Sequence, residues 1–400
     1  MDDTRLHIGI VSVLFDAKPE GVCTGRLLRA LLEAGFKVTL FTSDKAKLGF
    51  SHDNLIIKVI SSKPREPRSL FKLIARLSGQ IPNNFYIWGR RVAKQGIDSS
   101  SDTGSDSNID TADMPDVIYG RAWPHASLVA AYQLAIRHTR PLILHFSDPF
   151  PPPNESLAKP QFMQDLQQML DYASALTITN AETIEYQSRY LSLDSDKAHV
   201  LPHVAPPAKQ YLDSVSENRQ FHYIGSAGHK RPMDLLLAGF KLHLQQHAED
   251  QLIFVGTEAA LIEPLIKSLG ISAQVEIMPF SNQLDKFIAQ SSGLIAVDTN
   301  VADPIYTPTK IVEYLNTNKK VLAITPDGSP VQKLLRECSQ TSVVVADYHA
   351  EAVATGFSNL ASLAPQASDY DSRFALMQPF SASSVASRFA DICAGLNLKK

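Results

Sequence analysis

A short loop near the middle of the chain combines small residues with two adjacent cations. The loop "SAGHKRP" follows the apolar segment "FHYIG", and its basic side chains are Lys230 and Arg231. A residue such as Gly225 lets the backbone approach a ligand closely, and the amide groups that open a following helix favour an anion. Basic side chains at the same place favour a phosphate. The loop is therefore a candidate phosphate site, with an ordinary turn as the alternative.

A second pair of charges stands in "TPTKIVEYL", which predicts a helix. We expect Thr307 to cap the free amide groups and Pro308 to take the first helical position. Lys310 and Glu313 are three residues apart and lie together on the helical wheel. The apolar face opposite them consists of Ile311, Val312 and Leu315. The pair is either a solvated surface ion pair or part of a ligand site.

The elements that would position these charges repeat along the chain. Short Val/Ile/Leu-rich runs alternate with helix-period segments, which is the pattern of βαβ units and parallel sheets. In the first half the expected strands are residues 7–14, 37–42, 55–60, 116–120, 142–146, 175–179 and 199–203. In the second half they are 221–225, 251–256, 274–279, 293–298, 320–325 and 342–347. The fold class is therefore α/β, with two Rossmann-like domains.

Three loops of the second half follow such strands. In open α/β sheets ligands bind outside the carboxyl ends of the strands, so these loops would line one edge of the same sheet. They are the Lys230 loop, the loop that leads to Thr309, and "PDGSP" with Gly328 and Ser329, which opens a helix at Pro330. Together they suit a phosphorylated ligand, with Glu313 as a carboxylate for sugar hydroxyls.

The domain boundaries follow from changes in composition. Prolines and polar residues interrupt the alternation at 202–220, so we expect domains over 1–205 and 206–379. Residues 380–396 have helix-period apolar spacing, so 380–400 should hold a terminal helix. Six aspartates and many serines between residues 97 and 116 predict a mobile loop, about 97–114.

Composition excludes several classes of protein. With 44% hydrophobic and 20% charged residues the chain is ordinary for a globular protein, and no apolar run approaches the ~18 residues of a membrane helix. The acids near the N-terminus argue against a signal peptide. The three cysteines lack metal-site spacing, so we expect reduced thiols in a cytoplasmic protein. A net charge of −3 and the lack of a groove-binding motif argue against nucleic acid.

The first half offers candidates for an acceptor side and for catalysis. The loop after the first strand contains Gly21, Thr24 and Gly25, whose small side chains would permit close approach or make an ordinary turn. His145 and Asp148 stand at the end of a buried strand in "LHFSDPF". His145 is a candidate base or hydrogen-bond donor, because its pKa lies near neutrality, or a structural core residue. His125, after Pro124, is a second candidate.

Four segments together resemble a known family. "FHYIGSAGHKRPMDLLLAGF", "TPTKIVEYLNTNKKVLAITPDGSP", "LILHFSDPF" and "HVLPHVAP" look like the GT-B glycosyltransferases of family 4, in an order that covers nearly the whole chain. The resemblance implies two Rossmann-like domains facing a central cleft, with the C-terminal helix crossing back to the N-terminal domain. It also implies transfer of a sugar from a UDP- or GDP-sugar to an acceptor hydroxyl with retention, in polysaccharide or glycoconjugate biosynthesis.

The resemblance assigns roles to several residues. Glu313 matches the second glutamate of the paired-glutamate motif, which holds the donor ribose, while the first glutamate would fall at Ile305 and is absent. Lys310 would lie near the donor, and Lys230 or Arg231 would hold its diphosphate. No metal and no cofactor are expected. Two alternatives stay open: a non-catalytic nucleotide or small-molecule binding protein of this fold, and a GT-B-type sugar-nucleotide epimerase.

A basic segment bears on the acceptor. Residues 63–94 contain eight Lys and Arg against one acid, with Arg68, Lys72 and Arg76 on one helical face and aromatic residues nearby. Such a helix can lie on an anionic membrane surface, which would favour a lipid-linked acceptor at the cytoplasmic face of a membrane. The alternative is a solvated helix packed on its own domain.

Overall fold

The structure is a computed structural model that describes residues 6–16, 19–62, 88–89, 91–92, 114–122, 125–153, 160–212, 218–228, 230–281 and 283–396. The basic segment 63–94 lies outside the described residues except for 88–89 and 91–92, and the predicted loop 97–114 does so except for Met114. The membrane and mobility predictions made for these segments therefore stay predictions.

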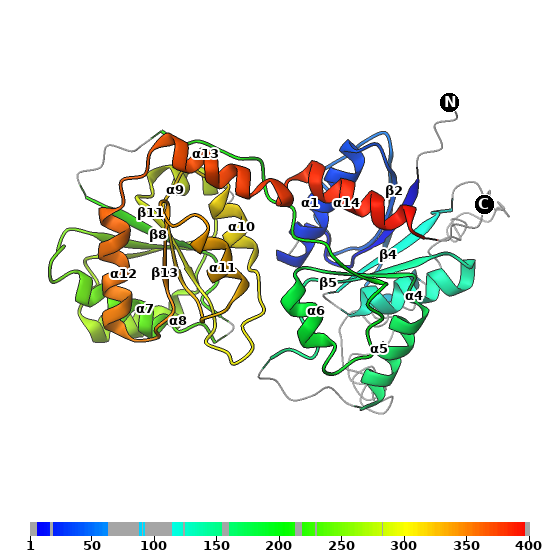
Figure 1. Cartoon of the computed structure of the whole chain (residues 1–400), viewed down its shortest axis with the longest axis horizontal. Helices are drawn as coiled ribbons and strands as arrows, with labels where there is room; N and C mark the ends of the chain where they lie inside the picture. Colours follow the sequence, from blue (N-terminus) through cyan, green and yellow to red (C-terminus); the bar gives the residue numbers. More distant parts are fainter. Residues whose placement is uncertain are drawn as a thin grey trace. The chain divides into compact units, whose positions relative to one another are not determined.

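The chain forms two compact units, each with its own parallel sheet (Figure 1). Unit 1 consists of Met1–Val204 together with Phe380–Lys400, and unit 2 consists of Ala205–Pro379. Helices alternate with the strands in both units, so the predicted α/β fold class with two Rossmann-like parts is confirmed.

The sheet of unit 1 has the strand order β3-β2-β1-β4-β5-β6-β7. Both faces of this sheet are covered by helices, which explains why its central strands read as unbroken apolar runs. The strands are β1 (His7–Val11), β2 (Lys37–Ser43), β3 (Leu55–Ile60), β4 (Val117–Ala122), β5 (Leu142–Phe146), β6 (Ala175–Ile178) and β7 (Ala198–Val200). The helices are α1 (Pro19–Glu33), α4 (Ala126–His138), α5 (Pro160–Tyr172), α6 (Ala181–Gln187) and α14 (Ala382–Ala394).

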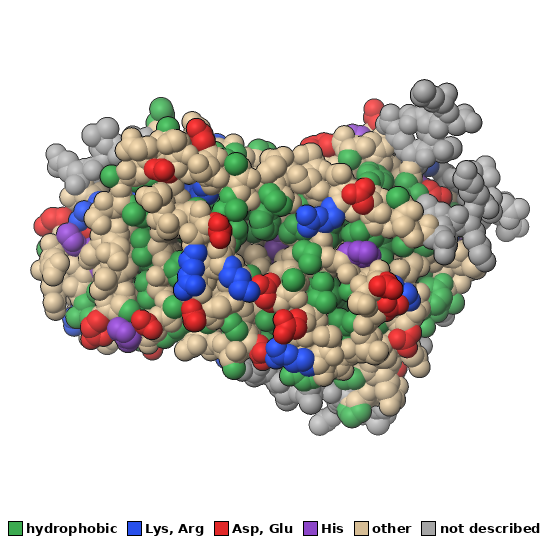
Figure 2. All heavy atoms as spheres, in the orientation of Figure 1, with side chains coloured by type: hydrophobic (Ala, Val, Ile, Leu, Met, Phe, Trp, Pro, Cys, Tyr) green, Lys and Arg blue, Asp and Glu red, His purple; other side chains and the backbone are tan. Residues whose placement is uncertain are grey.

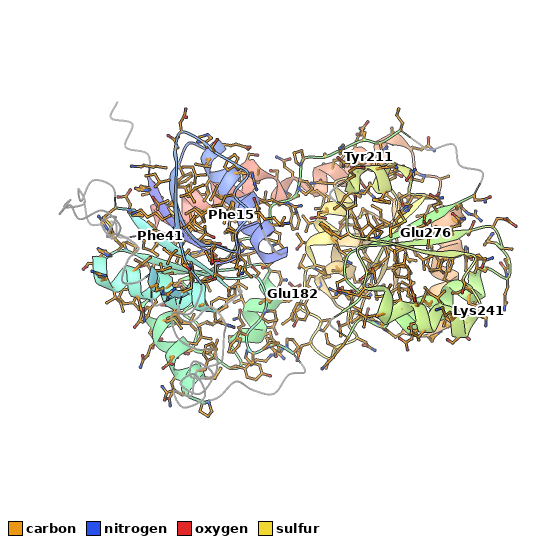
Figure 3. The ribbon with its side chains drawn as sticks, turned by 180° about the vertical axis from the view of Figure 1, so that it is seen from behind. Phe15, Phe41, Glu182, Tyr211, Lys241 and Glu276 are labelled. Atoms are coloured by element: carbon orange, nitrogen blue, oxygen red, sulfur yellow. The ribbon has the colours of Figure 1, made fainter. Side chains whose placement is uncertain are left out.

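Unit 1 has a separate hydrophobic core on each face of its sheet. One core contains Phe41 from β2 and side chains of α4 and α5. The other contains Phe15, which follows β1, and side chains of α1 and α14 (Figure 3). Although α14 comes from the end of the chain, it packs beside α1 in Figure 1 and completes this second core.

The sheet of unit 2 has the strand order β10-β9-β8-β11-β12-β13. Its largest core lies under α7, α8 and α12, and α7 and α12 run side by side in Figure 1. The strands are β8 (Gln220–Ile224), β9 (Gln251–Val255), β10 (Val275–Met278), β11 (Gly293–Val297), β12 (Val321–Ile324) and β13 (Ser342–Val345). The helices are α7 (Met233–His243), α8 (Ala259–Leu269), α9 (Leu284–Gln290), α10 (Thr309–Leu315), α11 (Pro330–Arg336), α12 (Ala350–Ser362), α13 (Ala367–Leu376) and the 3₁₀ turn η2 (Gln378–Phe380).

Each sheet has one point at which the strand order reverses. In unit 1 it lies between β1 and β4, and in unit 2 it lies between β8 and β11. Ligands of open parallel sheets bind outside the carboxyl ends of the strands at such a point. The residues that follow β1, β4, β8 and β11 are therefore the first place to look for function.

One helix start was predicted wrongly. α10 begins at Thr309, and its N-cap residue is Pro308, which has an extended conformation (φ −60°, ψ 137°) and provides no side-chain cap. Thr307 therefore lies one position before the N-cap, and Pro308 is the N-cap rather than the first helical residue. Among all the helices of the described residues, none is both long and apolar enough to cross a bilayer.

Candidate functional site

The loop that follows β8 begins at a glycine, Gly225, where any other residue would be strained. Gly225 has φ +121°, and its amide donates to the carbonyl oxygen of Val255 at 2.8 Å. A Cβ atom at this position would stand 3.4 Å from the Nζ atom of Lys310. Gly225 therefore provides both the backbone conformation and the space that brings α10 against β8.

Lys310 reaches from α10 back to the end of β8. Its Nζ atom lies 4.0 Å from the centre of the Tyr223 ring and is buried. Within the described residues Nζ has no hydrogen-bond partner. The sequence placed Lys310 on the face opposite the core; the structure instead folds its long side chain inward onto a core tyrosine. A buried ammonium group against a ring face has three N–H donors that can bind an anion.

The charges around Lys310 perturb one another. The pKa of Lys310 is lowered to about 7, mainly by burial and then by the charge of Arg231, while Asp298 and Glu313 oppose both effects. Burial also raises the pKa of Asp298 to about 6, against the effects of the Thr325 hydroxyl, Arg231 and Lys310. Two groups that titrate close to neutral pH thus stand together at the switch point of unit 2.

The structure separates the two neighbouring cations of the loop. The Arg231 guanidinium is held by two carbonyl oxygens, with Nε donating to Val297 at 3.1 Å and Nη1 to Gly228 at 3.0 Å. Arg231 also acts by charge on Lys310 and Asp298. Lys230 is exposed and has φ +57°. Arg231 is therefore the cation that the fold brings into the cluster.

The remaining predicted residues of unit 2 surround this cluster. Glu313 and Thr309 are half-buried on α10, and Glu313 is near enough to raise the pKa of Lys310. Ile305, at the position of the absent glutamate, is a buried apolar residue with 6% of its surface exposed.

Gly328 and Ser329 have local structural roles. Gly328 has φ +74°, and its amide donates to the side chain of Gln332 at 2.9 Å. The Ser329 hydroxyl is the N-cap of α11: it accepts from the Gln332 amide at 3.0 Å and lies 2.8 Å from the Thr325 hydroxyl. Their predicted contact with a donor stays a prediction.

Sequence reasoning missed two residues of the cluster. Asp298 follows β11 directly, and its Oδ2 atom accepts from the Thr325 hydroxyl at 2.9 Å. The Tyr314 hydroxyl accepts from the Ile224 amide at 3.2 Å and joins α10 to β8. The position of Asp298 at the end of a predicted strand was a usable signal. Tyr314 gave none, because it reads as an ordinary core residue of an amphipathic helix.

In unit 1 the residues predicted as an acceptor-side loop, Gly21, Thr24 and Gly25, lie instead within helix α1, against which the loop after β1 packs. A Cβ atom on Gly21 would stand 1.7 Å from the carbonyl oxygen of Leu14, and one on Gly25 would stand 2.0 Å from the Oδ1 atom of Asp16. Thr24 is buried and accepts from the Ser12 hydroxyl at 3.4 Å. Both glycines thus allow the loop after β1 to lie tightly on α1.

His125 lies at the start of α4 among aromatic rings. Its ring centre is 4.7 Å from that of Phe150 and 5.0 Å from that of Phe162. Burial lowers the pKa of His125 to about 3. A side chain with that pKa is a weak base at neutral pH, so these contacts favour a role in packing for His125.

His145 lies at the end of β5, with 1% of its surface exposed. Its Nδ1 atom is 3.0 Å from the Thr177 hydroxyl, and its Nε2 atom has no hydrogen-bond partner within the described residues. Burial, followed by the charges of Arg121 and His203, lowers its pKa well below the usual value. Asp148 is half-buried two residues beyond β5. The structure thus places both residues at the carboxyl edge of the sheet.

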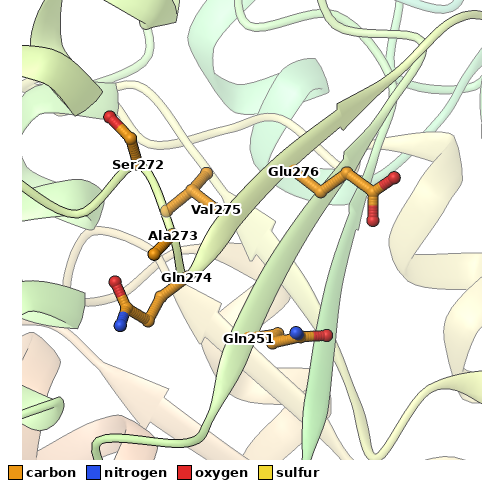
Figure 4. A pocket seen from close by; sticks show the side chains of 6 residues that line it. All are labelled: Gln251, Ser272, Ala273, Gln274, Val275 and Glu276. Atoms are coloured by element: carbon orange, nitrogen blue, oxygen red, sulfur yellow. The ribbon is translucent and has the colours of Figure 1, made fainter.

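A surface pocket of unit 2 lies away from these residues. It is lined by Gln251, Ser272, Ala273, Gln274, Val275 and Glu276 (Figure 4). Gln251 and Val275 are the first residues of β9 and β10, so the pocket lies at the amino edge of the sheet. The Lys310 cluster lies at the opposite, carboxyl edge.

Neither the distribution of surface charge nor the placement of metal-binding side chains indicates a further ligand site in the described residues. Lys and Arg side chains are interspersed with Asp and Glu over the face shown in Figure 2. Across the described residues, no group of three or more His, Cys, Asp or Glu side chains is placed to hold a metal ion. The expectation that no metal is needed stays a prediction.

The fold has close counterparts among solved structures. Neither a family model nor a curated protein sequence matches the chain. HepE of Anabaena, in complex with UDP and glucose, superposes with a TM-score of 0.67 at 13% identity, covering 98% of this chain and 100% of HepE. Trehalose-6-phosphate synthase of E. coli, bound with UDP-2-fluoro glucose, gives 0.67 at 12% identity, covering 96% of this chain and 98% of that one.

A third structure agrees with the first two. The apo form of the lipopolysaccharide outer core galactosyltransferase WaaB gives a TM-score of 0.63 at 11% identity, covering 98% of this chain and 99% of WaaB. The fold is therefore that of the GT-B glycosyltransferases, as the sequence predicted. Membership of family 4 stays a prediction.

Proposed function

We propose that this protein is a glycosyltransferase that takes a sugar from a nucleotide diphosphate donor and transfers it to an acceptor hydroxyl. The donor binds at the carboxyl edge of the unit 2 sheet, with its diphosphate against Lys310 and Arg231 and its ribose against Glu313. The bound UDP and UDP-sugar of the structural counterparts support a uridine nucleotide as the first candidate.

The main support for the proposal is the environment of the Lys310 ammonium group. It is buried, it has no hydrogen-bond partner within the described residues, and it stands beside a positive-φ glycine at the switch point of the sheet. Burying a charge without a partner is costly, and a protein retains such an arrangement where a ligand supplies the partner. A diphosphate supplies it.

The same geometry suits the chemistry of transfer. When the bond between the sugar and the diphosphate breaks, negative charge develops on the leaving phosphate oxygen. Lys310 and Arg231 are positioned before the reaction, so they stabilise that charge without reorganisation. Arg231 is held by two backbone carbonyls, which maintains its orientation. These residues supply the charge compensation without a bound metal.

We further propose that the transfer proceeds with retention, as in family 4, and that the product belongs to a polysaccharide or glycoconjugate. An acceptor hydroxyl that attacks from the face vacated by the diphosphate needs no protein nucleophile. The setting is cytoplasmic, with residues 63–94 as a candidate contact to a membrane surface and a sugar or lipid-linked acceptor as substrate. His145 and Asp148 are the candidate groups on the acceptor side.

A thermal-shift titration tests the donor site. Wild-type protein, Lys310→Met and Glu313→Ala are titrated with UDP, GDP, CMP and their common sugar conjugates. A ligand that binds only the folded state raises the melting temperature in proportion to its saturation. We expect one nucleotide to stabilise the wild type, and both variants to lose most of that shift. Absence of any shift at millimolar nucleotide would remove the main support for the proposal.

Measuring turnover of the donor distinguishes a transferase from the two alternative functions, a non-catalytic binding protein and an epimerase. A non-catalytic binding protein shows the nucleotide shift but neither transfers nor hydrolyses the sugar. An epimerase converts one free nucleotide sugar into another without an acceptor. Release of free nucleotide from the donor, accelerated by an acceptor and lost in Lys310→Met, is the result expected for the proposed function. Lys241→Met, on the outer part of α7, serves as a lysine control.

A further inference from the structure

The switch point of unit 1 contains a buried arginine, Arg121, with two nitrogens that the described residues do not pair. Arg121 is near the end of β4, the strand beside β1, with 4% of its surface exposed. Its Nε and Nη2 atoms are buried and have no hydrogen-bond partner within the described residues. Arg373, a buried arginine in unit 2, also has two buried nitrogens without a partner, Nε and Nη1, but its Nη2 donates to the carbonyl oxygens of Thr317 and Lys319. In the described residues no backbone carbonyl accepts from Nε or Nη2 of Arg121 in this way.

Two further side chains with unused polar atoms accompany Arg121. His145 is its neighbour in the register of β4 and β5, so both project from the same face of the sheet. The Nε2 atom of His145 and the Nδ1 atom of His203 are buried without partners in the described part of the chain. Both Arg121 and His203 act by charge on His145, which places the three groups together.

Two neutral side chains, Thr177 and Tyr119, lie next to His145 in the cluster. Thr177 binds the other ring nitrogen of His145 at 3.0 Å, and the Tyr119 ring lies 5.9 Å from that of His145. The Arg121 charge acts on the buried Tyr119 hydroxyl, opposing the effect of burial on its pKa. In the described residues no carboxylate forms an ion pair with Arg121. The cluster therefore has donors and positive charge in excess.

The geometry of the two unpaired nitrogens of Arg121 indicates which kind of chemical group would bind there. Nε–H and one Nη2–H lie on the same edge of a planar guanidinium and point in nearly parallel directions. That edge binds two oxygens of one carboxylate or one phosphate group. His145 and His203 can each donate one more hydrogen bond to such a group from a ring nitrogen.

We propose that unit 1 binds an oxyanion, a carboxylate or a phosphate group, through the Nε and Nη2 edge of Arg121, with His145 and His203 beside it. Because the edge is covered, nearby side chains shift to admit the anion. The anion belongs to the second substrate, so the acceptor is an acidic or phosphorylated molecule. That last identification rests on the proposed transferase function, whereas the anion site itself does not.

The test uses the full chain and two anions, inorganic phosphate and glucuronate, titrated at constant ionic strength against the melting temperature. The variants are Arg121→Met, Lys310→Met and Arg29→Met. Arg29 is a matched control, since it lies in the same unit and is already paired with Asp16 at 2.5 Å. We expect an anion to raise the melting temperature of the wild type, Lys310→Met and Arg29→Met, and Arg121→Met to lose that response.

The unliganded proteins provide a second measurement. Removing a buried charge that has no partner relieves a cost, so Arg121→Met should melt at a higher temperature than the wild type. If Arg121→Met instead fails to fold or melts lower, the guanidinium is structural and the proposal is wrong. Arg121→Lys, which keeps the charge but not the planar edge, should fold and respond more weakly to the anion.

The remaining outcomes separate this proposal from the donor site. No response of the wild type to either anion, or a response lost in Lys310→Met but kept in Arg121→Met, would overturn it. If no nucleotide binds while an Arg121-dependent anion response is present, the anion site stands and the transferase function falls. A response to phosphate alone assigns a phosphorylated acceptor, and a response to glucuronate alone assigns an acidic sugar.

Discussion

At the scale of single residues, the shifted pKa values of Lys310 and Asp298 make the stability of the folded protein depend on pH. The pKa of Lys310 falls from 10.5 in the unfolded chain to about 7, so the unfolded state binds more protons between these values and stability rises with pH there. The pKa of Asp298 rises from 3.8 to about 6, so the folded state binds more protons in that range and stability falls as pH rises through it. Both are costs of desolvation.

Nucleotide binding should therefore be linked to protonation of Lys310. A diphosphate beside Nζ favours the charged form and raises its pKa, so binding takes up roughly half a proton near pH 7 and more above it. Titration calorimetry in buffers with different ionisation enthalpies measures this uptake. A UDP-sugar is used as the ligand, because it has no phosphate group that titrates near neutral pH. Proton uptake that falls rather than rises as the pH increases from about 6 to about 8 would show that Lys310 is not the group concerned.

At the scale of elements, the site depends on how α10 is joined to β8. α10 has seven residues and no side-chain cap, so contacts with the rest of unit 2 must hold it in place. Tyr314 provides one: its hydroxyl accepts from the Ile224 amide and lies 3.4 Å from the Ile224 carbonyl oxygen. Because Ile224 and Gly225 are adjacent, this contact also sets the distance between Lys310 and the loop.

Tyr314→Phe should weaken both the unit and the site. It leaves the Ile224 amide without that partner in a buried region, which costs about 1–3 kcal/mol. We expect a lower unfolding free energy in urea and a weaker nucleotide Kd, because α10 is then less well positioned. Tyr132→Phe, on α4 in unit 1, is the control and should leave the Kd unchanged. A normal Kd in Tyr314→Phe would mean that α10 is held by its apolar contacts alone.

At the scale of the whole molecule, the two cores of unit 1 are separate from the core of unit 2. α14 brings Phe389 into unit 1, where its ring centre is 6.2 Å from that of Phe36 and 5.4 Å from that of Tyr119. Phe389 is fully buried. In unit 2, Phe357 occupies a comparable position against Phe221 and Phe240. The last helix of the chain is thus part of unit 1. The cores of unit 1 and the core of unit 2 share none of these rings.

Calorimetry should therefore resolve two unfolding transitions. Phe389→Ala removes a buried ring and should destabilise unit 1 by about 3–5 kcal/mol, without changing the shift that nucleotide causes in unit 2. Phe357→Ala is the matched variant and should lower the transition that nucleotide raises. A single transition that both variants lower equally would contradict this separation of the units.

Much of the fold could be predicted from the sequence, because its signals are local. A strand covered on both sides, such as β5 or β11, reads as an apolar run, and a small-residue loop after it marks the carboxyl edge of the sheet. The same signals identified the Lys230 loop and "TPTKIVEYL" as places for a ligand. They did not distinguish Lys230 from Arg231, because neighbouring residues in a loop differ only in the direction that the backbone gives them.

Local patterns of residues thus account for the alternation of strands and helices, for the three loops at one edge of the second sheet, and for the presence of charge in them. Which of these charges meet depends on how the sheet is assembled. Lys310 is buried on Tyr223 beside Gly225, and Arg121 lies next to His145, because parallel pairing brings together the ends of strands that are far apart in the chain. The periodicity of one segment contains no information about the register of another, so burial and the partners of a charge appear only when the sheet is assembled.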